Sequence, residues 1–292
     1  MNVTTALTKI SYALRGIDDD APTFGDDEAV YWLSVLNDKK DELHRDPKKK
    51  WSTGFKQTAP IEPGTVATTG TTTLTGTSTY FEDYRVGDKI TVDGETVRTI
   101  ATISSDTVLT VTVAFSNTAS AKTFTHTTII ATGVQSYNLH RSFLLPSDQV
   151  EVTTTDDEIL YYTIIHPQER NTTTQNVFVS GDNPKVLTYS AEITSTDNVV
   201  GGSLSVPGYY LPDDMTAGSD ILPFPDPNWG TMATAAEIAF NDIIYEDKAD
   251  GINAKANALY AMMSQANRAG TWNNPRKIPT SVVRIRDTRT RS

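Results

Sequence analysis

Threonine becomes the dominant residue abruptly at about position 64, and residues that favour helices become scarce from there on. β-branched side chains such as threonine favour strands, because they pack well on a pleated, half-buried surface. Before position 64 and after Thr231, apolar residues instead recur with the spacing of one helix face. The chain therefore predicts helical ends on either side of a large β insertion.

Two helices are expected at each end of the chain. The first two are separated by an acidic loop that contains Pro22, and the second closes at Pro47. The last two are expected to begin at Thr231 and after Asp250-Gly251. Their predicted buried stripes are Leu7, Ile10 and Leu14; Val30, Leu33, Leu36 and Leu43; Met232, Ala236, Phe240 and Ile243; and Ile252, Leu259, Met262, Met263 and Ala266. Because neither pair alone buries enough apolar surface, we expect the N- and C-terminal helical hairpins to pack as one bundle.

Short strands separated by turns are predicted in the insertion. Residues 89–98 contain Asp93-Gly94 between two strand-like runs, which is the signal of a hairpin. A further strand is expected at 108–113, and strands at this spacing are typical of a small barrel or sandwich. Farther along the chain, the expected strands are 149–152, 160–165, 177–179 and 185–189. The insertion is thus expected to hold two β modules.

These patterns predict an α+β fold, in which a helical bundle carries a large all-β insertion and an extended C-terminal arm. The predicted segments are an N-terminal helical part at 1–60, a Thr-rich β module at 64–131, a second β region at 132–207, a Pro- and Gly-rich connector at 208–228, a C-terminal helical part at 229–270 and a basic arm at 271–292. No apolar run is long enough to cross a bilayer, so no membrane partner is expected. The absence of cysteine fits synthesis in a reducing cytoplasm.

The end of the chain is a cationic arm on an acidic protein. Residues 275–292 hold six basic side chains and one acidic side chain, a balance of +5, so the remainder carries −16 of the total charge of −11. A frayed solubilising tail is one interpretation, but Val283 and Ile285 alternate with polar residues, which such a tail does not need. A proline-bounded segment of this kind is typical of chain that orders on a partner. The side chains expected to bind that partner are Arg276, Lys277, Val283, Arg284, Ile285 and Arg286.

The sequence holds no pattern that indicates catalysis. No nucleophile elbow, phosphate-binding loop or dinucleotide-binding motif is present. The four histidines are His44, His126, His140 and His166. None lies three or four positions from another, as a helical zinc pair requires. We therefore expect no enzymatic activity, no cofactor and no metal site, and we expect each histidine to be a polar surface residue or one with satisfied hydrogen bonds.

Acidic and aromatic clusters leave other interpretations open. The acidic clusters are 18–20, 26–28, 156–158 and 213–214. Paired carboxylates can hydrolyse a glycosidic bond, but acids at turns and helix starts more commonly act as caps. The aromatic clusters are 80–81 with Tyr84, 161–162 and 209–210. Such rings can form a sugar-stacking face, although at strand spacing they more commonly fill a core or a subunit interface.

Several stretches of the chain carry a resemblance to a known family. Residues 13–17, Ala-Leu-Arg-Gly-Ile, precede an acidic loop and residues 27–38, which end in Leu-Asn-Asp. Together with residues 162–171, 206–212, 227–229, 235–242 and 253–257, these stretches resemble the head-to-tail adaptor proteins, or connectors, of the neck of tailed bacteriophages. The module that contains the Asp93-Gly94 turn resembles a small β domain that recurs in phage structural proteins.

The resemblance implies a non-enzymatic structural protein of the virion, located at the head–tail junction. Such adaptors form a homo-oligomeric ring, usually of about twelve copies, beneath the portal. The ring extends the DNA channel and joins the head to tail or neck proteins. The basic arm would then reach the portal, with the six residues named above as portal contacts. An acidic channel wall would let DNA slide past without sequence-specific binding.

Two other functions remain open. In the first, the protein is a peripheral tail or decoration protein whose β region at 64–207 binds a glycan or a host receptor. In the second, it is a virion-associated cell-wall hydrolase that uses its acidic clusters. The adaptor hypothesis predicts that the arm is essential for attachment, whereas the decoration hypothesis predicts that the arm is dispensable.

Overall fold

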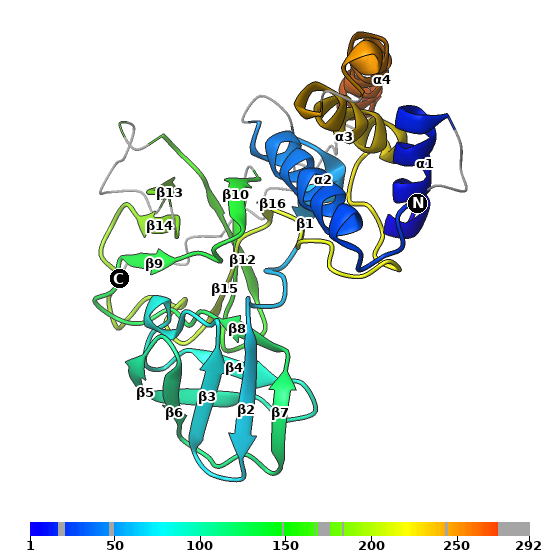
Figure 1. Ribbon diagram of the computed structural model, residues 1–292. Helices are drawn as coiled ribbons and strands as arrows, with labels where there is room; N and C mark the ends of the chain where they lie inside the picture. Colours follow the sequence, from blue (N-terminus) through cyan, green and yellow to red (C-terminus); the bar gives the residue numbers. More distant parts are fainter. Residues whose placement is uncertain are drawn as a thin grey trace. The chain divides into compact units, whose positions relative to one another are not determined.

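A computed structural model of the chain provides the fold (Figure 1). It describes residues 1–16, 21–46, 50–147, 149–166, 168, 176–182, 184–242 and 245–273, and of residues 267–273 the backbone alone. Within these ranges the chain forms sixteen strands, four α-helices and two short 3-10 helices. No helix in the same ranges is both long enough and apolar enough to cross a membrane. Strands are therefore the most numerous elements of the regular structure.

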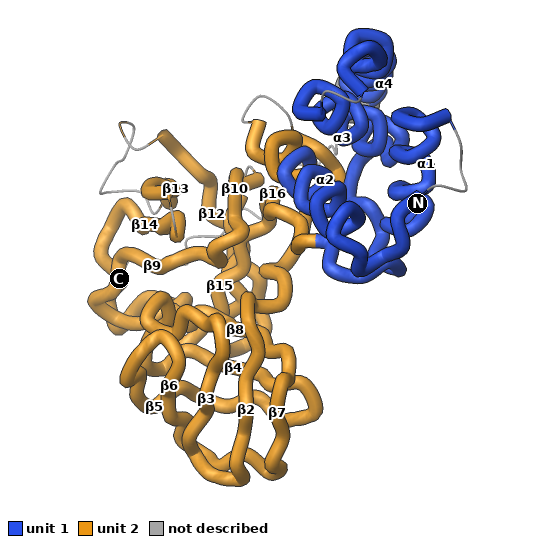
Figure 2. Tube along the Cα trace, in the orientation of Figure 1, with its two compact units in different colours: residues 1–39, 215–292 blue, residues 40–214 orange. Residues whose placement is uncertain are grey.

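The chain divides into two compact units, which Figure 2 colours separately. The helical unit comprises residues 1–39 and 215–292, and the β unit comprises residues 40–214. The chain passes between units inside α2 (Asp27–Arg45) and again between Asp214 and Met215. The β unit is thus inserted into the helical unit along the sequence.

The helical unit contains α1 (Val3–Arg15), the first part of α2, α3 (Pro227–Asn241) and α4 (Glu246–Asn273). Leu7, Ile10 and Leu14 are buried, so the predicted stripe of α1 is confirmed. α1 packs against α3, and α3 packs against α4. The buried residues of α3 include the small residues Gly230, Thr231, Thr234, Ala235, Ala236 and Ala239. Small side chains let helix backbones approach closely, which suits α3 to its two helical neighbours.

Other helical predictions need correction. Val30 and Phe240 are 57% and 55% exposed, whereas Trp32 and Trp229 are buried. Helix α3 begins at Pro227, earlier than predicted, because the Asp226 side chain caps its first turn. Helix α4 begins at Glu246 and runs through Asp250-Gly251 without interruption. One glycine costs a helix only about 1 kcal/mol, so the favourable residues around it outweigh this cost.

A seven-stranded antiparallel sheet, here called the curled sheet, forms one part of the β unit (Figure 1). In pairing order its strands are β7 (Thr118–Lys122), β2 (Thr65–Thr69), β3 (Thr73–Thr77), β6 (Val108–Val111), β5 (Arg98–Ser105), β4 (Lys89–Val92) and β8 (Phe124–Thr127). The edge strands β7 and β8 are consecutive and only Thr123 separates them, so the sheet curls back on itself. The pairing of β2 with β7 is irregular, and Ala121 there has a φ of 53°. Irregularities of this kind bend a strand and help a sheet to curl.

The interior of the curled sheet is filled by alternating apolar residues of its strands. Ile90 and Val92 of β4 are buried, and Phe124 of β8 meets Phe81 edge to face with ring centroids 5.9 Å apart. Phe81 belongs to the 3-10 helix η2 (Phe81–Asp83). Strands β4 and β5 pair around Asp93-Gly94, so the predicted hairpin is confirmed. Its loop extends to residue 97 and is longer than the two-residue turn.

Three small antiparallel sheets form the rest of the β unit, here called the three-sheet region. Their strand orders are β1-β16-β10, β12-β11-β15 and β13-β14-β9. The strands are β1 (Phe55–Lys56), β9 (Ser136–Asn138), β10 (Phe143–Pro146), β11 (Gln149–Thr153), β12 (Ile159–Thr163), β13 (Val177–Ser180), β14 (Val186–Tyr189), β15 (Ser203–Ser205) and β16 (Gly208–Tyr210). Strand β1 follows the 3-10 helix η1 (Ser52–Gly54). One apolar cluster, which includes Tyr137, Val150 and Leu187, joins the three sheets.

The predicted bundle of N- and C-terminal helical hairpins is wrong. The described residues form sixteen strands, which include a curled sheet of seven, and only four α-helices. Helix α1 does pack on α3, from the other end of the chain. The last turns of α2 are held within the β unit instead. There the Lys40 side chain is fully buried, donates to the Pro212 carbonyl at 2.9 Å and pairs with Asp214. Trp51 also donates its indole N–H to the Leu43 carbonyl. These polar contacts hold the end of α2, from Lys40 onward, within the β unit, so the N-terminal helices do not form a hairpin that is separate from the sheets.

Candidate functional site

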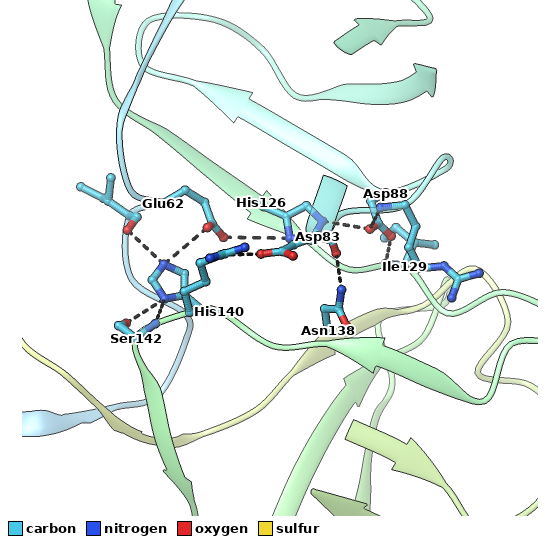
Figure 3. A network of polar contacts seen from close by, with 11 residues as sticks. Glu62, Asp83, Asp88, His126, Ile129, Asn138, His140 and Ser142 are labelled. Carbon is cyan, nitrogen blue, oxygen red and sulfur yellow. Dashed lines mark hydrogen bonds and ion pairs between the residues drawn. The ribbon is translucent and has the colours of Figure 1, made fainter. Parts of the chain in front are cut away.

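A buried carboxylate, Glu62, belongs to a network of polar contacts in the β unit (Figure 3). Glu62 belongs to the segment that joins β1 to β2, and it is 7% exposed. Its backbone N–H donates to the Phe124 carbonyl at 3.0 Å, which holds the segment beside β8. His126 of β8 and His140, which lies between β9 and β10, flank its carboxylate. Three distant stretches of chain therefore meet at one acidic group.

Tyr84 supplies a hydroxyl donor to Glu62. Burial raises the pKa of the Tyr84 phenol, and the negative charge of Glu62 and their hydrogen bond raise it further. The phenol therefore keeps its proton and acts as a fixed donor. A buried carboxylate needs such donors, because an unpaired charge in this environment is strongly destabilising.

His126 is held between two carboxylates. Its Nδ1 lies 4.0 Å from Glu62 Oε1, and its Nε2 lies 2.9 Å from Asp88 Oδ2. The imidazole ring stacks on Tyr84, with ring centroids 4.0 Å apart and planes inclined by 9°. Asp88 also accepts the backbone N–H of Ile129 at 2.8 Å. The ring is thus held by a hydrogen bond at Nε2 and by stacking on one face.

His140 is oriented by its own loop. Its Nδ1 accepts the backbone N–H of Ser142 at 3.1 Å, and the Ser142 hydroxyl lies 2.7 Å from the same nitrogen. A nitrogen that accepts a backbone N–H carries no proton, so the neutral ring carries its proton on Nε2. That nitrogen lies 3.5 Å from Glu62 Oε2 and 3.3 Å from the Ile61 carbonyl. The loop geometry therefore directs a donor at Glu62.

An ion pair lies beside this network. Arg141 Nε donates to Asp83 Oδ2 at 2.6 Å, and the guanidinium group lies 3.6 Å from the centre of the Tyr80 ring. A planar guanidinium stacks well on an aromatic face. Asn138 donates its side-chain amide to the Asp83 carbonyl at 3.0 Å, which anchors η2 to the three-sheet region. The arrangement fixes both members of the pair.

These groups line a hollow of about 410 Å³ in the β unit, here called the Glu62 cavity. Its charged and imidazole lining consists of Glu62, Asp83, His126, His140 and Arg141. Threonine and serine hydroxyls from β8, β11 and β15 form much of the remainder. The described residues hold no cluster of three or more His, Cys, Asp or Glu side chains arranged to bind a metal ion.

The network positions Glu62 as an acceptor of hydrogen bonds. Tyr84 donates to it, and the two imidazole rings lie on either side. A carboxylate has room for about four hydrogen bonds, so Glu62 keeps acceptor capacity toward the cavity. This geometry can orient a ligand that carries hydroxyl or amide donors.

A second hollow, of about 460 Å³, lies in the helical unit and is mostly apolar. It is lined by Lys9, Tyr12, Asn228, Thr231, Met232, Lys255, Ala258, Leu259 and Met262. Tyr12 and Met262, which line it, are 60% and 58% exposed. We call this surface the helical groove.

The six arm residues predicted to bind a partner lie outside the described residues. They are Arg276, Lys277, Val283, Arg284, Ile285 and Arg286. Helix α4 extends to Asn273, past the predicted start of the arm at residue 271. The prediction that these side chains bind a partner therefore stays a prediction.

The acidic and aromatic clusters take mostly structural positions. The cluster at 156–158 forms the turn between β11 and β12, and Asp214 pairs with Lys40, while 18–20 lies outside the described residues. Phe81, Tyr84 and Tyr210 are buried, whereas Tyr161 is 58% exposed. Most of these rings thus fill the two β cores.

Sequence patterns did not reveal the Glu62 network. Glu62 stands alone between Ile61 and Pro63, and no local spacing links it to His126 or His140. The expectation that lone histidines have satisfied hydrogen bonds holds for His44, which contacts the Lys40 carbonyl and the Thr53 hydroxyl. Only the pairing of β8 with its neighbours and the loop before β10 brings His126 and His140 together.

Comparison with known proteins adds no family to these observations. No family model matches the chain, and no curated protein sequence matches it significantly.

Proposed function

We propose that the protein is a head-to-tail adaptor of a tailed bacteriophage. In this role it is a non-enzymatic structural protein of the virion that forms a ring beneath the portal. The ring extends the DNA channel and joins the head to tail or neck proteins. The resemblance of residues 13–17, 27–38, 227–229, 235–242 and 253–257 to that family supports the proposal.

The observation that carries the proposal is the segregation of charge along the chain. The last eighteen residues carry a balance of +5 on a protein whose remainder carries −16. Their position immediately after α4 suits a segment that leaves the helical unit to reach another protein. Because opposite charges guide association and register, an arginine-rich arm suits an acidic surface on the portal.

The helical groove supports the self-association that a ring requires. Its exposed apolar side chains, such as Tyr12 and Met262, provide surface of the kind that subunit contacts bury. The acidic remainder supports a channel wall on which DNA does not bind, since phosphate binding needs a cationic face.

Truncation after Asn274 tests the role of the arm. We expect the shortened protein to unfold at the same temperature as the full chain but to lose binding to purified portal protein. The double variants Arg284→Gln/Arg286→Gln and Val283→Ser/Ile285→Ser separate the charged from the apolar contribution. Lys89→Gln, an exposed cation on β4, is the matched control and is expected to bind normally. Normal portal binding by the truncated protein would contradict the proposal.

Cross-linking mass spectrometry on purified particles tests the location. We expect Lys277 to link to a portal subunit and expect links between copies through the helical unit. Links only to the capsid exterior or to distal tail proteins would instead favour the decoration protein with a ligand-binding β region.

A further inference from the structure

The charged groups that line the Glu62 cavity already have polar partners within the protein. Arg141 pairs with Asp83, and Glu62 accepts from Tyr84 between the rings of His126 and His140. A charged ligand would have to displace one of these partners and leave its counterpart uncompensated, which is costly in a buried site. The cavity therefore suits a ligand that is polar and electrically neutral.

The walls of the cavity carry hydroxyl groups that are free to bind a ligand. Thr125 and Thr127 come from β8, and Ser203 begins β15. Within the described part of the chain, these three hydroxyls make no hydrogen bond to other protein groups. Each hydroxyl offers one donor and two acceptor positions. A ligand rich in hydroxyl groups can use all of these positions at once.

Apolar surface is interspersed with the hydroxyls. Pro63, Leu139, Leu204 and the half-buried Tyr80 also line the cavity. Carbon–hydrogen faces of a ligand can pack on these side chains while its polar edge meets the hydroxyls and Glu62. Among small neutral compounds, sugars combine an apolar ring face with a hydroxyl-bearing edge.

The size of the cavity sets the size of the ligand. A volume of about 410 Å³ lies toward the lower end of the roughly 300–1,000 Å³ typical of small-molecule sites. We propose that the Glu62 cavity is a binding site for a neutral saccharide of one or two residues, with Glu62 accepting a sugar hydroxyl. This site is independent of the arm and of the proposed adaptor role.

Saturation-transfer NMR and calorimetry on the full-length protein test the proposal. The probes are glucose, galactose, N-acetylglucosamine, rhamnose, maltose and chitobiose, with glucuronate and glucosamine as charged counterparts. We expect at least one neutral probe to bind in the millimolar range or tighter and expect its charged counterpart to bind at least tenfold more weakly. Failure of every neutral probe to bind at up to about 10 mM would overturn the proposal.

Variants locate the binding. Thr127→Val and Ser203→Ala remove hydroxyls that have no partner within the described protein, so the fold should tolerate both. Each is expected to weaken the saccharide about fivefold, the equivalent of one lost hydrogen bond. Thr75→Val is the matched control, because Thr75 is exposed on β3 and does not line the cavity. Equal affinity in the Thr127→Val/Ser203→Ala double variant and in Thr75→Val would place any binding elsewhere and overturn the assignment.

Glu62→Gln examines the central acceptor while preserving its volume. We expect the saccharide to bind at least tenfold more weakly to this variant. Thermal unfolding accompanies each measurement, so that a loss of fold is distinguished from a loss of the site. Unchanged affinity in a folded Glu62→Gln protein would contradict the role given to the carboxylate.

Discussion

The helical unit and the β unit bury different kinds of polar group. Within the described residues, the buried polar side chains of the helical unit are the hydroxyl-bearing Ser11, Thr231 and Thr234. Thr231 and Thr234 donate to carbonyls of the first turn of their own helix, Asn228 and Gly230. The β unit also buries titratable side chains, namely Lys40, His44, Glu62 and Asp88.

This difference shows what specifies the tertiary structure of each unit. A threonine hydroxyl is satisfied inside its own helix and makes no demand on neighbouring elements. A buried ionised group is stable only where other elements bring partners to it. Steric fit between helices therefore decides the packing of the helical unit, whereas hydrogen bonding and charge compensation add a second requirement in the β unit.

The largest expected effect is the loss of a buried carboxylate from the β unit. Asp88 is 2% exposed and accepts from the Arg85 and Ile129 backbone N–H groups and contacts His126. We expect Asp88→Ala to lower the free energy of unfolding by about 3–5 kcal/mol, because it leaves these buried partners without an acceptor. Chemical denaturation measures the change, with Asp88→Asn as a milder substitution.

Asp93→Ala is the matched control for this prediction. The Asp93 carboxylate pairs with Lys122 at the surface, where its side chain is 63% exposed. Exposed pairs contribute about 0–1 kcal/mol, so little change is expected. Similar losses in the Asp88 and Asp93 variants would show that burial of charge does not distinguish the β unit.

A steric change is expected to dominate in the helical unit. A Cβ atom at Gly230 of α3 would lie 2.6 Å from two carbons of the Phe224 ring. We expect Gly230→Ala to destabilise the protein by about 1–3 kcal/mol through overpacking. Gly251 of α4 has no heavy atom within 4 Å of such a Cβ. Gly251→Ala should therefore stabilise the protein by about 1 kcal/mol through helix propensity, and thermal unfolding of both variants should reveal opposite signs.

The β unit also buries a hydroxyl group, that of Tyr189, that lacks a hydrogen-bond partner among the described residues. Tyr189 is 1% exposed, and its hydroxyl has no hydrogen-bond partner in the described part of the chain. We expect Tyr189→Phe to stabilise the protein by about 1 kcal/mol, because an unsatisfied buried polar group is removed. The Tyr210 hydroxyl donates to the Val206 carbonyl at 2.9 Å. Tyr210→Phe is thus the control, and urea denaturation should show it to be destabilised by about 1 kcal/mol.

The smallest expected effect is a pH dependence that arises from His44. Burial lowers the pKa of the His44 imidazole in the folded protein below its ordinary value of 6.5. As the pH falls below 6.5, the unfolded chain takes up this proton first, so stability falls. We expect His44→Gln to lose less stability than the native chain between pH 7 and pH 5, measured by denaturant titration. An identical loss of stability in both proteins would show that His44 does not cause the pH dependence.

Local sequence patterns predict an element correctly where residues close together in the sequence determine it. Leu7, Ile10 and Leu14 define the buried face of α1, and Asp93-Gly94 marks the hairpin of β4 and β5. The predicted buried face of α2 is wrong at Val30, which is exposed, whereas Trp32 is buried. Both side chains are apolar, so only the packing decides which of them is buried. Periodicity locates an apolar face, but it does not identify the element that covers that face.

Local sequence patterns do not predict the candidate site. Glu62, His126 and His140 stand in three separate stretches, and none has a local motif that indicates the others. Their meeting depends on the pairing of β4 with β8 and on the hydrogen bonds of the loop before β10. These are long-range contacts, so a buried charge and its partners become visible together only in the folded chain.

By itself, the sequence determined the helical character of the ends, the β character of the middle and the cationic arm. These properties follow from residue types and spacings within a few positions, where backbone geometry and side-chain shape act directly. The tertiary structure alone decided that α1 packs on α3, that β7 and β8 allow the sheet to curl, and that two histidines flank Glu62. Each of these outcomes requires segments far apart in the chain to satisfy one another's apolar surface, hydrogen bonds or charge.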